Sequence, residues 1–200
     1  MSLTLTTLPT ATEEVVIFDT EYTTWEGARA RGWSAPGEYR EVVQIAAQRI
    51  DLASGAVQAE FAEYVRPRIN DTLSTFFIEL TGITQDTIDT HGRDFLPVYR
   101  EFVAWVGECA VYSYGSSKAS DGDILAENLA LYDLAEPYDA TRYHNLRPLF
   151  QAAGIPVEQY SSGQLYQAFN LSLSGHVHNA MHDVRSLAQS LLALKDQLNS

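Results

Sequence analysis

Two acidic residues, Asp19 and Glu21, directly follow the apolar run Val15–Phe18. Such a run is typical of a short buried strand, and residues two apart in a strand point to the same face, about 6.5–7 Å apart along the backbone. The two carboxylates can therefore converge on one cation. This stretch alone also fits a plainer interpretation, in which a strand ends in solvent with two charges at its tip.

Two further acidic residues, Asp121 and Asp183, each have leucines four and eight residues further along the chain. That spacing places each carboxylate on the apolar face of a predicted helix, where its burial is costly unless it is paired or bound to a metal. Both are candidate ligands. Asp121 also fits an ordinary helix cap together with Ser120, and Asp183 fits a buried carboxylate held by a nearby backbone group. Asp123 competes with Asp121, but its neighbour four residues on is Glu127, so we expect Asp123 to face outward.

Three histidines, His176, His178 and His182, lie close to Asp183 in the sequence. His178 and Asp183 are five residues apart, which is about 140° around a helix, so they cannot face one site from within the same helix. If Asn179 caps the helix, His178 lies on the preceding loop and can reach the carboxylates as a general base. The alternatives are solvated loop histidines and a zinc site formed by all three, which the break between loop and helix disfavours.

Hydrophobic patterning predicts the elements that position these residues in the first half of the chain. The segments 41–50 and 57–65 flank the turn Asp51–Gly55 and predict an antiparallel hairpin. Together with the strand before them, they form a meander of three strands. The segment 23–39 contains four Gly or Pro residues and two tryptophans and predicts a long loop. The predicted strands are Val15–Asp19, 41–50 and 57–65, and a short apolar helix over 73–80 ends at Gly82.

In the second half, helices and strands alternate. The predicted helices cover 94–106, 121–132, 147–153, 161–169 and 179–198, and the predicted strands cover 110–115 and 140–146. A meander followed by alternating helices and strands predicts one α/β domain with a mixed sheet.

Composition limits the class of protein. The chain has 200 residues, of which 46% are hydrophobic, enough for one domain over 13–200 after a flexible lead-in over 1–12. No segment resembles a signal peptide or a membrane span, and the single cysteine, Cys109, fits a reducing compartment, so we expect a cytoplasmic protein with no membrane association. The formal charge of −13 opposes long-range attraction to a polyanion, so a nucleic-acid partner must be held locally or through metal ions.

Taken together, Phe18–Glu21, Asp121 and His178–Asp183 resemble, in order and spacing, the three motifs of the DEDDh 3′–5′ exonucleases. This DnaQ-like group has an RNase H-like fold. The segment Leu73–Asp86, which contains Leu-Thr-Gly-Ile-Thr, resembles the Eri-type branch, which includes the histone-mRNA 3′-exonuclease and its bacterial relatives. The resemblance implies an α/β fold with a mixed five-stranded sheet, its first three strands antiparallel, flanked by helices.

The resemblance also implies an activity and its cofactors. Asp19, Glu21, Asp121 and Asp183 would hold two divalent cations, Mg²⁺ or Mn²⁺, and His178 would take a proton from the attacking water. The implied enzyme is a hydrolase that releases nucleoside monophosphates from the 3′ ends of single-stranded RNA or DNA. The alternatives are a DNA-directed proofreading or repair exonuclease and a catalytically silent RNase H-like binding module. The module would be favoured by loss of one of the five residues, and all five are present.

Substrate contacts are implied by the same resemblance. Phe76 and Leu80 match an aromatic residue and a leucine that sandwich the terminal base in the Eri-type branch, and Thr20 and Tyr22 of the first motif are expected to join them. Stacking does not discriminate between bases, so little sequence preference should follow. From its spacing alone, Phe76 fits a core position equally well.

This chain departs from the family pattern in two ways. The second motif, over 114–121, is longer than usual and has Ser120 where a tryptophan can stand, which leaves Asp123 as a second candidate ligand. Eukaryotic members of the family also carry a separate nucleic-acid-binding domain, which we do not expect in this chain. Because its surface is acidic, we predict short single strands or recessed ends as substrates, or a homodimer or recruiting protein that supplies affinity. Trp25 and Trp33 could stack on substrate, although a loop aromatic more often folds over the core.

Overall fold

The computed structural model describes residues 14–115 and 121–199. The predicted lead-in 1–12 and Ser120, with its proposed capping role, lie outside these residues. No helix within the two described ranges has the length and apolar character needed to cross a membrane.

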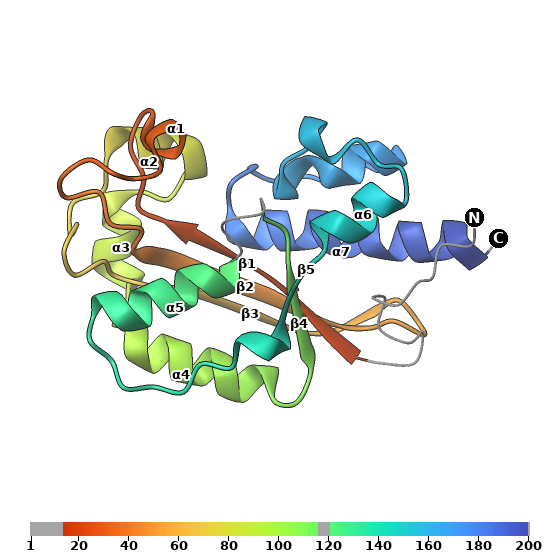
Figure 1. Ribbon diagram of the computed structural model, residues 1–200, viewed down its shortest axis with the longest axis horizontal. Helices are drawn as coiled ribbons and strands as arrows, with labels where there is room; N and C mark the ends of the chain where they lie inside the picture. Colours follow the sequence, from red (N-terminus) through yellow and green to blue (C-terminus); the bar gives the residue numbers. More distant parts are fainter. Residues whose placement is uncertain (1–13, 116–120, 200) are drawn as a thin grey trace.

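A five-stranded mixed sheet forms the centre of the fold, with the strand order β3-β2-β1-β4-β5 (Figure 1). β1 and β3 pair with β2 in antiparallel orientation, whereas β4 pairs with β1 and β5 in parallel orientation. The mixed sheet and the antiparallel first three strands are therefore confirmed. The strands are β1 (Glu14–Tyr22), β2 (Val42–Asp51), β3 (Ala56–Tyr64), β4 (Ala110–Ser113) and β5 (Tyr143–Asn145).

Helices cover both faces of this sheet (Figure 1). The α-helices are α1 (Ala28–Arg31), α2 (Thr75–Thr81), α3 (Gln85–His91), α4 (Phe95–Val106), α5 (Asp121–Leu131), α6 (Arg147–Ala152) and α7 (Ala180–Asn199). The 3₁₀ helices are η1 (Ala140–Arg142), η2 (Val157–Gln159) and η3 (Ser162–Phe169). α7, α6 and η3 pack on one face, and α4 and α5 pack on the other.

The alternation of side chains along β1 sets the position of the acidic residues. Val15 and Ile17 are buried in the cluster under α7, whereas Val16 and Phe18 are buried in the cluster under α4 and α5. Continuing the alternation, Asp19 and Glu21 share the α7 face and Thr20 shares the α5 face. The two helices that begin near Asp121 and Asp183 therefore approach the end of β1 from opposite faces of the sheet.

Several elements differ from the sequence-based predictions in length or type. β1 continues to Tyr22 because its polar end still pairs with β2, with Glu21 opposite Gln44. The predicted edge strand over 140–146 shortens to β5 after a 3₁₀ turn, and the predicted helix over 161–169 is the 3₁₀ helix η3. Two α-helices were missed: α1 inside the predicted loop, and α3, which buries only Ile88 and so has no apolar stripe to reveal it. The 3₁₀ helix η2 was also missed.

Glu41 anchors the segment that carries α2. Its fully buried carboxylate accepts backbone N–H groups from residues 68, 69 and 70 at 2.6–2.8 Å and the Tyr132 hydroxyl at 2.7 Å. A carboxylate that receives four donors fixes the chain at that point, because no other group there can accept them all. Glu41 thus ties the approach to α2 to Tyr132, the residue that follows α5.

Replacing Glu41 by alanine should destabilise the protein strongly. The change leaves three backbone N–H groups and one hydroxyl without their acceptor, and we expect the free energy of unfolding to fall by about 3 kcal/mol. Urea unfolding followed by circular dichroism measures this. Glu108→Ala removes the same charge from an exposed position and should change stability by less than about 0.5 kcal/mol. Equal losses in the two variants would contradict the anchoring role.

Candidate active site

A cavity of about 900 Å³ opens at the carboxyl end of β1. It is lined by the residues that the family resemblance implied for metal binding, catalysis and substrate contact, namely Asp19, Thr20, Glu21, Tyr22, Phe76, Leu80, Asp121, His178 and Asp183. β1, α2, α5, the loop before α7 and α7 itself supply these side chains. Residues far apart in the sequence therefore meet at one site.

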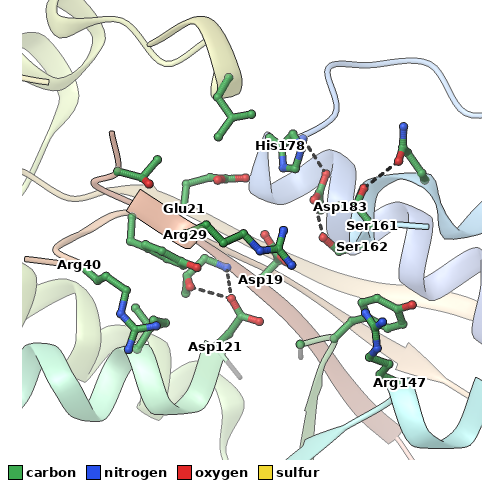
Figure 2. Close-up of a pocket in the computed structure, with 18 of the residues that line it drawn as sticks. Asp19, Glu21, Arg29, Arg40, Asp121, Arg147, Ser161, Ser162, His178 and Asp183 are labelled. Atoms are coloured by element: carbon green, nitrogen blue, oxygen red, sulfur yellow. Dashed lines mark hydrogen bonds between the residues drawn. The ribbon is translucent and has the colours of Figure 1, made fainter. Parts of the chain in front are cut away.

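Asp19 and Glu21 form the floor of the cavity on β1. Both are buried, with 6% and 9% of their surface exposed, and both point into the cavity beside Asp183 (Figure 2). Their shared direction follows from their spacing of two residues in an extended strand. The alternative of two solvated charges at a strand tip is therefore wrong.

Asp121 opens α5 and is held by β1. Its Oδ1 accepts the Thr20 backbone N–H at 2.9 Å and the Thr20 hydroxyl at 2.7 Å (Figure 2). The predicted apolar face of this helix is present, since Leu125 and Leu129 are buried. Asp123 is exposed and does not line the cavity. The structure thus places Asp121, and not Asp123, beside Asp19.

Asp183 lies on the first turn of α7 and is almost fully buried. Its Oδ2 accepts the Ser162 hydroxyl at 2.7 Å, and its Oδ1 accepts the His178 backbone N–H at 3.0 Å (Figure 2). The start of α7 is itself fixed, because Ala180 N donates to the Gln44 side chain at 2.9 Å. A backbone group thus holds the Asp183 carboxylate, as the alternative interpretation predicted. The same carboxylate also faces the cavity.

His178 lies on the loop before α7, as predicted from the angle between it and Asp183. α7 begins at Ala180, and His178 has a positive φ of 67°, a left-handed conformation that turns the chain into the helix. Its half-buried side chain lines the cavity.

The other two histidines have different surroundings. His182 is buried, with its ring nitrogens 3.0 Å from the Gly163 carbonyl and 3.4 Å from the Ser174 carbonyl. His176 is exposed, with Nδ1 2.6 Å from the Val177 carbonyl. Neither ring joins His178 in a group of possible metal ligands within the described parts of the chain. The alternative of a three-histidine zinc site is therefore not supported.

Burial and mutual repulsion dominate the electrostatics of the cavity. The pKa values of Asp19 and Glu21 are raised well above normal by burial and then by the neighbouring carboxylates. Burial raises the pKa of Asp121 to about 6 even though the Thr20 hydrogen bonds lower it, and burial also raises the pKa of Asp183. The pKa of His178 is lowered, chiefly by burial, which favours a neutral imidazole that can accept a proton.

The donor set fits a divalent cation. Glu21, His178 and Asp183 offer ligand atoms that all lie within 4.8 Å of one another, and Asp19 and Asp121 line the same cavity. Oxygen-rich sites of this kind suit hard divalent ions, and a cation would offset both the burial of the carboxylate charges and their mutual repulsion. The site could therefore bind metal and, with a neutral histidine beside it, activate water.

An aromatic and apolar wall faces the acidic residues. Phe76 and Leu80 lie four residues apart on α2 and both line the cavity, while Phe77 enters the core instead. Phe76 is 36% exposed, so its alternative assignment to the core is wrong. Trp25 and Trp33 also line the cavity, and the Trp33 ring contacts the Tyr22 ring edge-on at 5.7 Å between centroids.

Several residues that position or face the site were missed by the sequence analysis, and four of them bear directly on its chemistry. Ser162 and Gly163 of η3 contact Asp183, Gln44 of β2 holds the start of α7, and Arg29 of α1 lines the cavity. The adjacent Ser-Gly pair was the one available signal, because a glycine often marks a close approach of backbone to another group. Gln44 and Arg29 carry no sequence signal of their own.

The chain matches the family model described as Exonuclease (RNase_T) over residues 16–191. The 3′-5′ exoribonuclease 1 of Homo sapiens is 26% identical over 182 residues, which cover 88% of this chain and 50% of that protein. ERI1 exoribonuclease 2 of Danio rerio is 38% identical over 76 residues, which cover 38% of this chain and 12% of that protein. The chain spans half or less of the length of these curated relatives.

Among solved structures, the chain is similar to the nuclease domain of 3′hExo, a DEDDh family member bound to rAMP. The TM-score is 0.76 at 24% identity, and the match covers 96% of each chain. This likeness confirms the predicted RNase H-like fold.

Gly163→Ala should displace the Asp183 carboxylate. A Cβ at Gly163 would lie 2.2 Å from Asp183 Oδ1, so the side chain or η3 must move. We expect Mn²⁺ affinity, measured by calorimetry, to fall about 10-fold or more. Gln167→Ala, at an exposed position on the same helix, is the control and should bind Mn²⁺ like the unmodified protein. Unchanged Mn²⁺ affinity in Gly163→Ala would count against Asp183 as a ligand.

Asp121→Asn should stabilise the metal-free protein near neutral pH. The folded-state pKa of Asp121, about 6, lies above its ordinary value, so its contribution to stability is present at low pH and is lost as pH rises through about 6. Asparagine removes the charge and keeps an oxygen for both Thr20 donors. We expect a gain of about 1–3 kcal/mol at pH 7.5 in EDTA and a smaller gain at pH 5.

Urea unfolding at the two pH values measures this difference. Asp123→Asn, which removes a charge from an exposed position two residues away, corrects for the overall acidity of the chain. If Asp123→Asn stabilised the protein at pH 7.5 as much as Asp121→Asn, the burial of the Asp121 charge in the cavity would not be the cause.

Proposed function

The chain belongs to the Exonuclease (RNase_T) family, and we propose that it is a metal-dependent 3′–5′ exonuclease that releases nucleoside monophosphates from single-stranded RNA or DNA 3′ ends. The observation that carries this proposal is the convergence of four carboxylates and His178 in one cavity with Phe76 opposite. A phosphodiester hydrolase needs a cation site, a base and a surface for the nucleobase, and this cavity has residues suited to each.

Asp19, Glu21, Asp121 and Asp183 would hold two divalent ions, which we propose to be Mg²⁺ or Mn²⁺. When bound, such ions supply an acidified water and stabilise negative charge at the reacting phosphate. The proposal is supported by the chemistry of the donors and by the raised pKa values of Asp19 and Glu21, which arise from burial and from neighbouring carboxylates and which a bound cation would lower.

His178 would accept the proton of the attacking water at an imidazole nitrogen. The water oxygen forms a bond to phosphorus while the bond between phosphorus and the 3′ oxygen of the preceding nucleotide breaks. The products are a nucleoside 5′-monophosphate and a strand with a new 3′ hydroxyl. A lowered pKa keeps the imidazole neutral before this step, and the hydrogen bond from its backbone N–H to Asp183 fixes its position.

Phe76 and Leu80 would hold the terminal base, and Tyr22 and Thr20 would contact the nucleotide from β1. Burial raises the pKa of Tyr22 to about 12, so its hydroxyl remains a hydrogen-bond donor at neutral pH. Trp25 and Trp33 would border the strand as it leaves the site. These aromatic side chains favour a single-stranded substrate. Because the formal charge is −13, we expect affinity for nucleic acid to come from contacts inside the cavity or from a protein partner. We also propose a cytoplasmic location.

Incubation with a 5′-labelled single strand and Mg²⁺ or Mn²⁺ should produce a ladder that shortens from the 3′ end. EDTA should abolish the ladder, and Asp19→Ala should slow cleavage by about 10³-fold or more because the cation site is incomplete. His178→Ala should slow it by about 10²- to 10⁴-fold.

Matched RNA and DNA strands in the same assay separate a ribonuclease from a DNA-directed enzyme. His182→Ala is a poor control because His182 is buried, so the exposed His176→Ala is used and should remain active. If no metal-dependent ladder formed on either strand, the catalytically silent module would be the better description. Full activity of His178→Ala would exclude it as the base.

A further inference from the structure

Three arginines line the cavity, and two of them are already paired. Arg40 forms an ion pair with Glu127, and its guanidinium lies 5.1 Å from the centroid of the Trp33 ring. Arg147 pairs with Glu158 at 2.6 Å and lies over the Tyr114 ring. Arg29 is exposed, and its guanidinium makes no hydrogen bond or ion pair with any residue of 14–115 or 121–199. Its charge is thus available to a ligand in the cavity.

The segment that carries Arg29 is held firmly in place. Ala28 is fully buried, and its carbonyl accepts Trp33 N at 2.9 Å. Arg31 donates to the Glu26 carbonyl at 2.9 Å and from Nε to Glu38 Oε2 at 2.9 Å, which closes the loop on itself. α1 is flanked by Gly27 and Gly32, which both have positive φ. The ordering of this loop fixes the position from which Arg29 reaches the cavity.

The Arg29 side chain projects into the cavity toward the acidic residues and His178 (Figure 2). Its charge is felt at His178, where it adds to the effects of burial and of His176 in lowering the pKa. An arginine directed at a cavity with four carboxylates would be drawn into ion pairs if its only role were to neutralise them. It instead remains without an ion pair among the described residues, at a position where an incoming anion would meet it.

We propose that Arg29 binds the phosphate of the nucleotide that is removed, through a non-bridging oxygen. This inference rests on the exonuclease function proposed above and adds a phosphate-binding residue to that site. Guanidinium groups recognise phosphate through paired N–H donors, and hydrolysis turns a phosphodiester into a monophosphate with more negative charge. The contact is therefore stronger toward the product side of the reaction, which favours the transition state as that charge develops.

The phosphate contact can be tested by binding, separately from cleavage. With the full chain and Mg²⁺ present, calorimetry compares adenosine 5′-monophosphate with adenosine, which lacks the phosphate. Arg29→Ala should weaken binding of the monophosphate about 10- to 100-fold and leave adenosine binding unchanged. Arg29→Lys should fall between the two because it retains the charge without the paired donors. Arg100→Ala removes an exposed arginine that does not line the cavity and should bind both ligands like the unmodified protein.

Four results would overturn the proposal. They are unchanged monophosphate affinity in Arg29→Ala, equal losses in Arg29→Ala and Arg100→Ala, equal losses for monophosphate and adenosine, and no detectable monophosphate binding by the unmodified protein. Tighter Mn²⁺ binding by Arg29→Ala with unchanged monophosphate affinity would assign Arg29 to neutralising the carboxylates instead.

Failure of the proposed exonuclease function would be distinct. It would appear as the absence of a cleavage ladder from the unmodified protein, whatever Arg29→Ala does to monophosphate binding. Thermal unfolding of each variant checks that the exposed substitutions leave the fold intact.

Discussion

Four carboxylates in one buried cavity repel one another, and much of the surrounding structure holds them there against that repulsion. Burial is the first cause of the raised pKa values of these carboxylates, and repulsion by neighbouring carboxylates adds to it at Asp19, Glu21 and Asp121. Burial alone is costly for a carboxylate, and each additional negative charge nearby adds to the cost. Such a site persists because favourable interactions elsewhere in the fold offset the cost of the buried charges. A bound cation would reduce that cost directly.

The fold opposes the repulsion with hydrogen bonds from fixed groups. Backbone N–H groups of Thr20 and His178 donate to Asp121 and Asp183, so the positions of these carboxylates follow from the backbone itself. Side chains add a second layer, in which the Ser162 hydroxyl and the Gln44 amide set the position of Asp183 and of the helix that carries it. Fixed donors of this kind cost little reorganisation when charge changes during a reaction.

The sequence predicted the parts of this arrangement that depend on local periodicity. Alternation along β1 placed Asp19 and Glu21 on one face, helical spacing placed Asp121 and Asp183 above buried leucines, and the angle argument placed His178 on a loop. What it could not predict depends on contacts between distant segments or on helices without an apolar stripe. α1 has four residues inside a Gly-rich loop and α3 buries only Ile88, so neither produces a periodic signal. The roles of Gln44, Ser162 and Arg29 arise from tertiary packing alone.

The net negative charge of the molecule opposes binding of a polyanion at long range, whereas arginines inside the cavity favour it at short range. The formal charge of −13 weakens the long-range attraction that most nucleic-acid-binding proteins use, and four of the carboxylates counted in that charge line the cavity. Three arginines line the cavity, and two of them are paired with glutamates, so they are too few to change the field at a distance. Association should therefore depend little on long-range steering, and discrimination should depend on contacts formed once a strand end is inside. An enzyme arranged in this way would select 3′ ends that can enter the cavity in preference to long polyanions that merely approach its surface.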